Sequence, residues 1–322
     1  MKKTAFVFPG QGSQKVGMGS SLCAESPEAL AVFDQANEIL GFDLKQLCFD
    51  GPEDVLKQTE NAQVALFTCS IAALCAFQAL SAYEPAAAAG HSVGEYAALV
   101  AAGSLEFADG LKLVRRRGEL MRDAAASVDG TMAAILGLEA EVARQACDEA
   151  QAEGTGVVTV ANYNGGGQVV ISGTVAGVQR AGEIAKEKGA RKVMPLTVSG
   201  AFHSPLMVNA GDALFASLAA TPFRKPAVPV ISNVEARYIQ APSDVTAGLT
   251  MQVSGSVRWE ESMQTLIKDG IDSIIEFGSG EVLCGLMKRI DKSIISCAVT
   301  DASNLAATVA LVASSTAEEV AE

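Results

Sequence analysis

The segment 131–197 restricts the fold of this chain more than any other feature of the sequence. It opens with the strand pattern TMAAILG and the helical stretch EAEVARQACDEA. Two β-rich runs, GVVTVAN and QVVISG, come next and are joined by a glycine-rich loop, which predicts a hairpin. The helical VAGVQRAGEIAKEKG and the strand RKVMPL complete the order βαββαβ, which is that of a ferredoxin-like domain.

The rest of the chain has the pattern of one α/β unit that this module interrupts. Thr4–Phe8 is a short apolar run that stops at a Pro-Gly pair, as a buried strand entering a loop does. Helical patterns occur at 26–40, 61–82, 94–102, 106–125, 205–220, 260–269 and 278–290, and extended segments at 86–89, 228–234 and 272–278. We therefore expect a large subdomain formed by residues 1–128 and 199–322 and a small subdomain formed by residues 129–198.

The composition supports an α/β fold and excludes some classes of partner. Of the 322 residues, 49% are hydrophobic but only 5% are aromatic, so small aliphatic side chains form the core. Such a core suits helices packed closely on a sheet. Acidic residues outnumber basic ones by 37 to 24, and the resulting net charge of −13 argues against nucleic acid as the main partner.

The cysteines and the apolar segments indicate the cellular compartment in which the protein resides. The seven cysteines form no CxxC pair, so we expect neither a disulfide framework nor a metal site, and a reducing compartment fits best. No stretch reaches the roughly 18 uncharged apolar residues that a membrane span needs. The chain begins directly with its first strand. These features predict a soluble, cytoplasmic protein that does not bind membranes.

The sequence Gly-His-Ser-Val-Gly at 90–94 is the clearest local signal of chemistry. In a GxSxG motif the serine lies on a tight strand-to-helix turn that flanking glycines permit, and its hydroxyl is exposed there. The next backbone N–H and the helix N-terminus face a developing oxyanion. The motif therefore predicts a nucleophile at Ser92, although a glycine-rich turn with an incidental serine remains an alternative at this point.

Two histidines are available to activate this serine. His91 is adjacent to Ser92, and neighbouring side chains diverge on a sharp turn, so His91 is poorly placed as the base. His203 comes directly after the inserted module. A serine hydroxyl is a weak nucleophile without an imidazole to take its proton. We therefore expect His203 to be the base, and the alternative of a buried core histidine would leave the serine without one.

The N-terminal loop at 9–14, PGQGSQ, does not bind a nucleotide in any standard way. A dinucleotide fingerprint needs glycine at position 15, where Lys15 stands, and a P-loop needs lysine at position 18, where Met18 stands. The loop can still supply a backbone N–H to an oxyanion, or it can be a simple turn.

Arg117 is the arginine of the RRR run that we expect to be partly buried. Leu111, Val114, Gly118 and Met121 define one face of the helix, and Arg117 falls beside that face while the other two arginines point away. A buried guanidinium requires a carboxylate partner. That carboxylate belongs either to this chain or to a substrate, and the sequence leaves both possibilities open.

Together these motifs resemble the malonyl-CoA:acyl carrier protein transacylases and the acyltransferase domains of fatty-acid and polyketide synthases. The resemblance covers nearly the whole chain in the family's order. Its motifs are FPGQGSQ, GHSVGEYAAL, RRGELM, VANYNGGGQVVISG, GAFHSPLM, VRWEES and GSGEVLCGLMKRI. It implies an α/β-hydrolase-like large subdomain with an inserted ferredoxin-like (βαββαβ) small subdomain, in agreement with the strand and helix pattern of the chain.

The resemblance implies a role for each matching residue of the reaction centre. Ser92 corresponds to the nucleophile that becomes acylated, and His203 corresponds to its base. Gln11 and Val93 match the positions whose backbone N–H groups form the oxyanion hole.

Five further residues match positions of the substrate pocket. Arg117 matches the arginine that pairs with the free carboxylate of a malonyl group, and Gln252 matches the residue whose backbone carbonyl orients the histidine. Asn162 and His91 match pocket positions. Phe202 matches a position that goes with malonyl selectivity, since its ring crowds a 2-methyl group.

The function that the resemblance implies is a ping-pong transfer of malonyl from malonyl-CoA to the phosphopantetheine thiol of an acyl carrier protein. Coenzyme A thioesters are then the substrates, and no permanently bound cofactor is expected. We expect a monomer. Both fatty-acid synthesis and a polyketide system fit. Candidates for carrier docking are the basic residues near the expected cleft: Lys186, Lys188, Arg191, Lys192, Lys288 and Arg289.

Three positions depart from the family's usual pattern. Ser256 stands before VRW, Gly166 in the glycine-rich loop and Ser279 before the late helix, each where many members have proline. All three replace a rigid residue with a flexible or small one.

Two other functions compete with acyl transfer. A serine hydrolase would use the same motif with water as acceptor, but it would place an acid between the serine and the histidine in the chain, and no candidate stands out. A neutral ester would also leave Arg117 unexplained. A non-catalytic carrier-binding subunit is disfavoured, because Ser92, His203 and Arg117 are all present.

Overall fold

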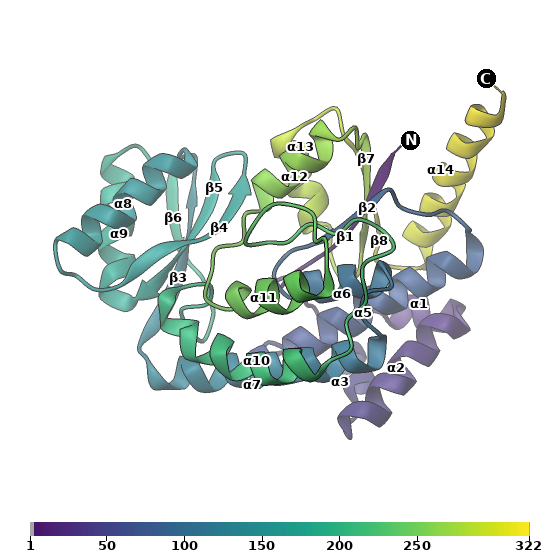
Figure 1. The fold of residues 1–322 in the computed structure, drawn as a ribbon, viewed down its shortest axis with the longest axis horizontal. Coiled ribbons are helices and arrows are strands. Elements are labelled where there is room, and N and C mark those ends of the chain that lie inside the picture. The colour runs from purple at the N-terminus through teal and green to yellow at the C-terminus, as the bar shows by residue number, and fades with distance from the viewer. Residues whose placement is uncertain (1–2, 322) are drawn as a thin grey trace.

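The computed structural model describes residues 3–321, with side chains up to residue 314, and contains two separate four-stranded sheets. Figure 1 shows the smaller body at one side of the molecule and the C-terminal helix at the other. The expected mixed α/β fold with two sheets is confirmed.

The first sheet is parallel and has the order β2-β1-β7-β8. Its strands are β1 (Thr4–Phe8), β2 (Ala87–Gly90), β7 (Ser273–Phe277) and β8 (Ile295–Val299). β2 consists of three alanines and a glycine, all buried, and its small side chains leave room for α6 to pack closely. Both faces of a parallel sheet are usually covered, which explains why β1 and β7 are buried along their whole length.

The second sheet is antiparallel, with the order β4-β5-β3-β6. Its strands are β3 (Gly130–Leu136), β4 (Val158–Gly165), β5 (Gln168–Thr174) and β6 (Lys192–Pro195). Helices α8 (Ala140–Ala152) and α9 (Val175–Glu187) pack against each other and against this sheet, and enclose a core of their own. This is the βαββαβ order expected for 131–197, while the subdomain boundaries at 129 and 198 stay a prediction.

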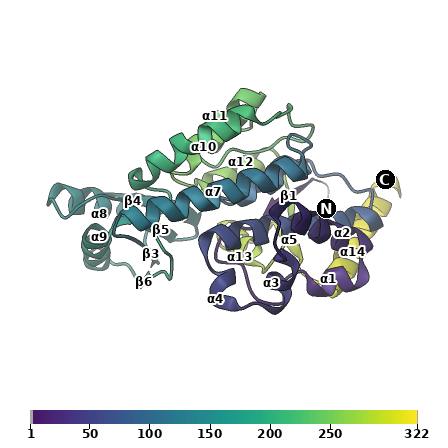
Figure 2. The ribbon, with the colours of Figure 1, turned by 90° about the horizontal axis from the view of Figure 1, so that it is seen from below.

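The remaining helices surround the parallel sheet. They are α1 (Ser20–Glu25), α2 (Pro27–Leu40), α3 (Leu44–Asp50), α4 (Glu53–Leu56), α5 (Thr59–Leu80), α6 (Gly94–Ala101), α7 (Phe107–Ser127), α10 (Val208–Ala220), α11 (Pro242–Gln252), α12 (Trp259–Lys268), α13 (Val282–Ile290) and α14 (Ala302–Ala321), with a 3₁₀ turn at Pro205–Met207. Figure 2 shows α7 running along the molecule toward the small subdomain, which begins where α7 ends.

Helix α5 is long and apolar enough to cross a bilayer by length and composition alone, contrary to the expectation that no segment would be. However, 78% of its apolar window is buried inside the protein, as in the core helix of a folded domain. It packs against α2, α6 and α7. The length of uninterrupted apolar sequence therefore reflects burial on all sides of the helix.

The segment VPVISNV is not a regular strand. Of the extended run expected there, Val230 and Ile231 form only isolated bridges, to Ala88 and Tyr238 respectively. This segment pairs with β2 only around Ala88 and does not form a full strand of the sheet. It carries Asn233 to the serine turn, where the side chain of this asparagine bonds to the backbone of Ser92.

Two of the three residues that depart from the family's pattern are held in place by hydrogen bonds of their own side chains. The hydroxyl of Ser256 donates to the carbonyl of Val160 at 2.6 Å, and that of Ser279 donates to the carbonyl of Ser13 at 2.7 Å. Gly166 has a φ of +58°, which a proline cannot adopt. Val257, which directly follows Ser256, bridges to Asn162 in β4, so this region joins the two subdomains.

Candidate active site

Ser92 lies on a sharp turn between β2 and α6. Its φ of +54° is in the left-handed region that residues with side chains seldom adopt. A Cβ added at Gly90 would lie 2.0 Å from the carbonyl of Gly94, and one added at Gly94 would lie 2.1 Å from the carbonyl oxygen of Phe8. The two glycines are therefore required for this close approach, which holds the serine hydroxyl at the carboxyl end of the parallel sheet.

His203 is the histidine that contacts this hydroxyl. Its Nε2 lies 2.7 Å from Oγ of Ser92. Its Nδ1 faces two carbonyl oxygens, of Gln252 at 2.8 Å and of Gly255 at 3.1 Å. Because a carbonyl can only accept, Nδ1 carries the hydrogen, and Nε2 is left with the lone pair that can take the serine proton.

Electrostatics keep this imidazole neutral. Burial, and then the positive charge of Arg117, lower the pKa of His203 to about 3. A neutral imidazole is the form that acts as a general base near pH 7. The position that a hydrolase triad gives to an acid is occupied by backbone carbonyls, so the arrangement differs from a standard Ser-His-Asp triad.

The N-terminal loop packs directly on the serine turn. A Cβ added at Gly10 would lie 2.6 Å from the carbonyl oxygen of His91, so the backbone of this loop approaches the turn closely. Among the described residues, the N–H groups of Gln11 and Val93 donate to no other backbone or side-chain group. Unpaired N–H groups in a loop and a turn that pack against each other are suited to stabilise an oxyanion.

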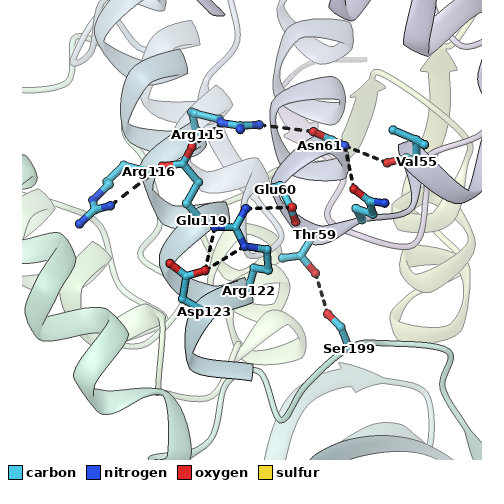
Figure 3. A network of polar contacts seen from close by, with 11 residues as sticks. Val55, Thr59, Glu60, Asn61, Arg115, Arg116, Glu119, Arg122, Asp123 and Ser199 are labelled. Carbon is cyan, nitrogen blue, oxygen red and sulfur yellow. Dashed lines mark hydrogen bonds and ion pairs between the residues drawn. The ribbon is translucent and has the colours of Figure 1, made fainter. Parts of the chain in front are cut away.

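The side chain of Gln11 joins this loop to a polar network at the start of α5. Its Nε2 lies 3.4 Å from the hydroxyl of Thr59, which lies 3.1 Å from the hydroxyl of Ser199. Figure 3 shows the Thr59–Ser199 contact beside the ion pairs of α7. Ser199 belongs to the segment that returns from the small subdomain toward His203, so the loop, α5 and this segment are held together.

Arg117 points from α7 into the site and is 1% exposed. Its Nη1 donates to Oε1 of Gln63 at 2.6 Å, and its Nη2 donates to Oγ of Ser92 at 3.1 Å and to Oε1 of Gln252 at 3.0 Å. All three partners are neutral, and Nε has no partner in the described part of the chain. The ring of Tyr96 lies 5.9 Å from the guanidinium carbon. Burial lowers the pKa of this guanidinium, and the charge of Glu95, which lies behind Gln252, opposes that shift. No carboxylate of the described side chains lies within ion-pair distance of Arg117.

Arg115 and Arg116 point outward from α7, as the helical periodicity predicted, and Arg122 lies toward the start of α5. Arg115 and Arg116 pair with Glu119, and Arg122 pairs with Glu60 of α5 at 3.0 Å. Figure 3 shows these pairs along α7 and between α7 and the start of α5. Each outward arginine therefore has a carboxylate partner from this chain, and the inward one has none within residues 3–314.

Two of the remaining expected pocket residues are neighbours of Ser92 or His203 in the chain, and the third lies at the junction of the subdomains. Phe202 is 4% exposed and packs in the main core directly before His203. Asn162 is 7% exposed in β4, at the junction of the subdomains. The ring of His91 donates or accepts through Nε2 to Oδ1 of Asn164 at 2.9 Å and lies 5.6 Å from the ring of Trp259, away from the serine hydroxyl.

Four residues that touch these groups were not expected from the sequence. Two are Gln63, the partner of Arg117, and Asn164, the partner of His91. The side chain of Asn233 accepts from the N–H of Ser92 at 2.7 Å, and Glu95 lies behind Gln252. Only Glu95 has a signal in the sequence, as an acid in the otherwise apolar segment EYAALVA. The others depend on contacts between distant segments.

A strained serine on a strand-to-helix turn, a neutral histidine and two free N–H groups define an acyl-transfer site. The chain matches the acyl transferase domain family over residues 5–301 and belongs to that family. A relative from Bacillus subtilis, "Malonyl CoA-acyl carrier protein transacylase", is 47% identical over 301 residues, which cover 94% of this chain and 94% of that protein. The resemblance seen in the sequence is confirmed.

Solved structures agree with this assignment. An acyl-carrier-protein S-malonyltransferase from Burkholderia pseudomallei 1710b is 44% identical and has a TM-score of 0.92, with 95% of this chain and 99% of that chain covered. A malonyl-transacylase in complex with its type II PKS acyl-carrier protein is 38% identical and has a TM-score of 0.93, with 96% and 99% covered.

Proposed function

We propose that this enzyme transfers the malonyl group from malonyl-CoA to the phosphopantetheine thiol of an acyl carrier protein, through a malonyl-serine intermediate on Ser92. The observation that carries the proposal is the buried Arg117, which lies 3.1 Å from the serine hydroxyl and has no carboxylate partner among the described side chains. A site with a buried guanidinium beside a nucleophile suits an acyl group that brings its own carboxylate.

The first half-reaction acylates the serine. Oγ of Ser92 attacks the thioester carbonyl while its proton passes to Nε2 of His203. The N–H groups of Gln11 and Val93 stabilise the negative charge on the tetrahedral oxygen. When the C–S bond breaks, the imidazolium returns its proton to the departing sulfur, and free coenzyme A leaves.

The second half-reaction runs the same steps in reverse with a new thiol. The phosphopantetheine thiol gives its proton to His203 and attacks the ester carbonyl of malonyl-Ser92. The C–O bond breaks, and the serine oxygen takes the proton back from the imidazolium. The carbonyls of Gln252 and Gly255 keep the imidazole in the same orientation in both half-reactions.

Arg117 selects the acyl group in this proposal. The malonyl carboxylate pairs with the guanidinium, and a bidentate charged pair is stronger than the contacts with neutral oxygens that the guanidinium makes in this structure. Phe202 contributes selectivity against a 2-methyl branch, by roughly 1–3 kcal/mol for one methyl group.

The remaining expectations belong to the same proposal. The carrier protein is the macromolecular partner, malonyl-CoA is the substrate, and no resident cofactor or metal takes part. All seven cysteines are unpaired, which supports a reducing, cytoplasmic location. We propose that the enzyme acts as a monomer.

The lifetime of the acyl-enzyme tests the proposal. We expect the intact protein to gain one malonyl group after brief incubation with malonyl-CoA, and much less adduct from methylmalonyl-CoA or acetyl-CoA. The adduct should persist in buffer and disappear when holo carrier protein is added. An adduct that water removes as fast as the carrier does would indicate a hydrolase instead.

A further inference from the structure

Glu95 is a buried carboxylate that the proposed mechanism does not use. It lies in the first turn of α6, three residues after Ser92, and is 1% exposed. Its Oε2 accepts two hydrogen bonds, from Nε2 of Gln252 at 2.6 Å and from the backbone N–H of Asn233 at 3.1 Å. A buried carboxylate is costly unless such bonds compensate it, so its presence in an apolar helix requires an explanation.

The hydrogen bond to Gln252 connects Glu95 indirectly to three groups of the site. The same Nε2 donates to the backbone carbonyl of Ser92 at 3.0 Å, and Oε1 of Gln252 accepts from Arg117 at 3.0 Å. The backbone carbonyl of Gln252 accepts from Nδ1 of His203 at 2.8 Å. One glutamine, itself fully buried, therefore touches the nucleophile's backbone, the arginine and the histidine.

The bond to Asn233 reaches the serine turn. Oδ1 of Asn233 accepts from the N–H of Ser92 at 2.7 Å, and its Nδ2 donates to the carbonyl of Gly90 at 2.6 Å. These two bonds hold the backbone on both sides of the turn. Glu95 fixes the backbone of Asn233 from behind, in a segment that forms only isolated bridges.

The chemistry of an amide explains why an acceptor is needed at this position. The amide of Gln252 can rotate by half a turn, which exchanges its donor and its acceptor. In the rotated form its NH₂ would face the guanidinium of Arg117, donor against donor. A fixed acceptor at Glu95 favours the one orientation in which Oε1 faces the arginine.

We propose that Glu95 is a positioning residue that fixes Gln252 and Asn233, and through them orients His203, Arg117 and the Ser92 turn. This inference rests on the proposed function for the roles of those three groups. Glu95 contacts neither the substrate nor the reacting atoms. Burial raises the pKa of Glu95 to about 7 and the charge of Arg117 opposes that rise, which agrees with a carboxyl enclosed in the site.

Two conservative variants distinguish the effect of the acceptor's position from the effect of the negative charge of Glu95. Glu95→Gln removes the charge but keeps a carbonyl oxygen where both bonds converge. Glu95→Asp keeps the charge but withdraws the acceptor by one methylene. We expect acylation of Ser92 by malonyl-CoA to fall by no more than about 3-fold in Glu95→Gln and by about 10-fold to 100-fold in Glu95→Asp, as for loss of a buried hydrogen-bond partner. A reversed order would overturn the proposal.

A second readout distinguishes positioning from a purely structural role. In Glu95→Asp the ratio of malonyl to acetyl transfer should fall, because the Gln252 amide is no longer fixed and no longer holds Arg117 in place. A structural role alone would lower the melting temperature and leave this ratio unchanged. Glu276→Gln is the matched control: this carboxylate is equally buried in β7, accepts the N–H of Cys284, and should leave both rate and ratio unchanged.

A double-mutant cycle completes the test. Gln252→Met removes the amide but leaves the bond from Asn233, so in that background Glu95→Asp should cost clearly less than in the wild-type chain, by the part that acts through Gln252. Full additivity would contradict the proposal. p-Nitrophenyl acetate reports the reactivity of Ser92 independently of malonyl. If wild type forms no malonyl adduct but the cycle holds with this ester, the proposed function fails while the positioning role stands.

Discussion

Nη2 of Arg117 lies 3.1 Å from Oγ of Ser92, and the arginine is almost fully buried. The two residues are 25 positions apart, one on the turn before α6 and the other in α7. In the proposed function, the cation that binds the acyl group and the atom that attacks it are thus adjacent. A preorganised pair of this kind needs little rearrangement at the moment of reaction. It also means that the same guanidinium influences both substrate selectivity and the histidine beside the serine.

Replacing Arg117 with alanine should change selectivity more than stability. A buried charge pair broken on one side costs about 2–5 kcal/mol, so kcat/KM for malonyl-CoA should fall by roughly 30-fold to several thousand-fold. Acetyl-CoA has no carboxylate and should lose little. Arg116→Ala, one residue away but exposed and paired with Glu119, is the control and should change neither substrate. Equal losses with both substrates and a lowered melting temperature would remove Arg117 from the binding site.

The pH dependence of acylation should reflect the lowered pKa of His203. His203 is an active base above its pKa, and its basic form is lost as the pH falls through that pKa. A pKa of about 3 therefore places the acid limb of the pH–rate profile well below 6.5, the ordinary pKa of histidine. In Arg117→Ala the acid limb of the pH–rate profile should move to higher pH. The positive charge of Arg117, one of the two main causes that lower the pKa of His203, is then absent. Acetyl-CoA acylation rates between about pH 4 and pH 8 measure this. A wild-type inflection near 6.5 would contradict it.

The glycines of the serine turn should not tolerate a methyl group. Gly90→Ala would place a Cβ 2.0 Å from the backbone of Gly94, and we expect a loss of more than about 2 kcal/mol in the free energy of unfolding together with loss of acylation. Gly285→Ala in α13 is the control: nothing lies within 4 Å of its added Cβ, and helix propensity predicts unchanged or slightly raised stability. Denaturant unfolding of both variants checks this.

Carrier recognition should depend on basic residues near the cleft. Of the six candidates, Lys188 pairs with Glu149 and Arg289 bonds to Gln168, so these two are already engaged. The four that form no ion pair among the described residues are exposed: Lys186, Arg191, Lys192 and Lys288. Reversing these four charges should raise the carrier's apparent KM without changing the malonyl-CoA half-reaction.

The control for carrier docking is Lys225→Glu, an exposed charge reversal in the segment after α10. It should leave carrier kinetics unchanged. Unchanged carrier kinetics in the four-residue variant as well would exclude this surface as the docking site.

Much of the fold could be predicted because local patterns are strong. The apolar run Thr4–Phe8 and the whole order of 131–197 matched the observed strands and helices. Helix α11, which carries Gln252, was not expected, because PSDVTAGLTMQ has little apolar periodicity. Strand β8 was also missed.

The contacts within the site were less predictable than its motifs. The turn at Ser92 has a local sequence signature in its two glycines. The bonds from Asn233 and Gln252 to that turn join residues 141 and 160 positions apart and arise only when the sheets and loops pack together. Sequence patterns report local conformation and burial, and such distant pairs result from tertiary structure.

The central claim is that Ser92 carries the malonyl group, and intact-protein mass spectrometry of Ser92→Ala with malonyl-CoA tests it most directly. The variant removes one buried oxygen and should fold as wild type does. We predict a malonyl adduct on wild type, none on Ser92→Ala, and acylation slowed by several orders of magnitude in His203→Ala, as for loss of the histidine base in other serine enzymes. A malonyl adduct on folded Ser92→Ala would contradict the account.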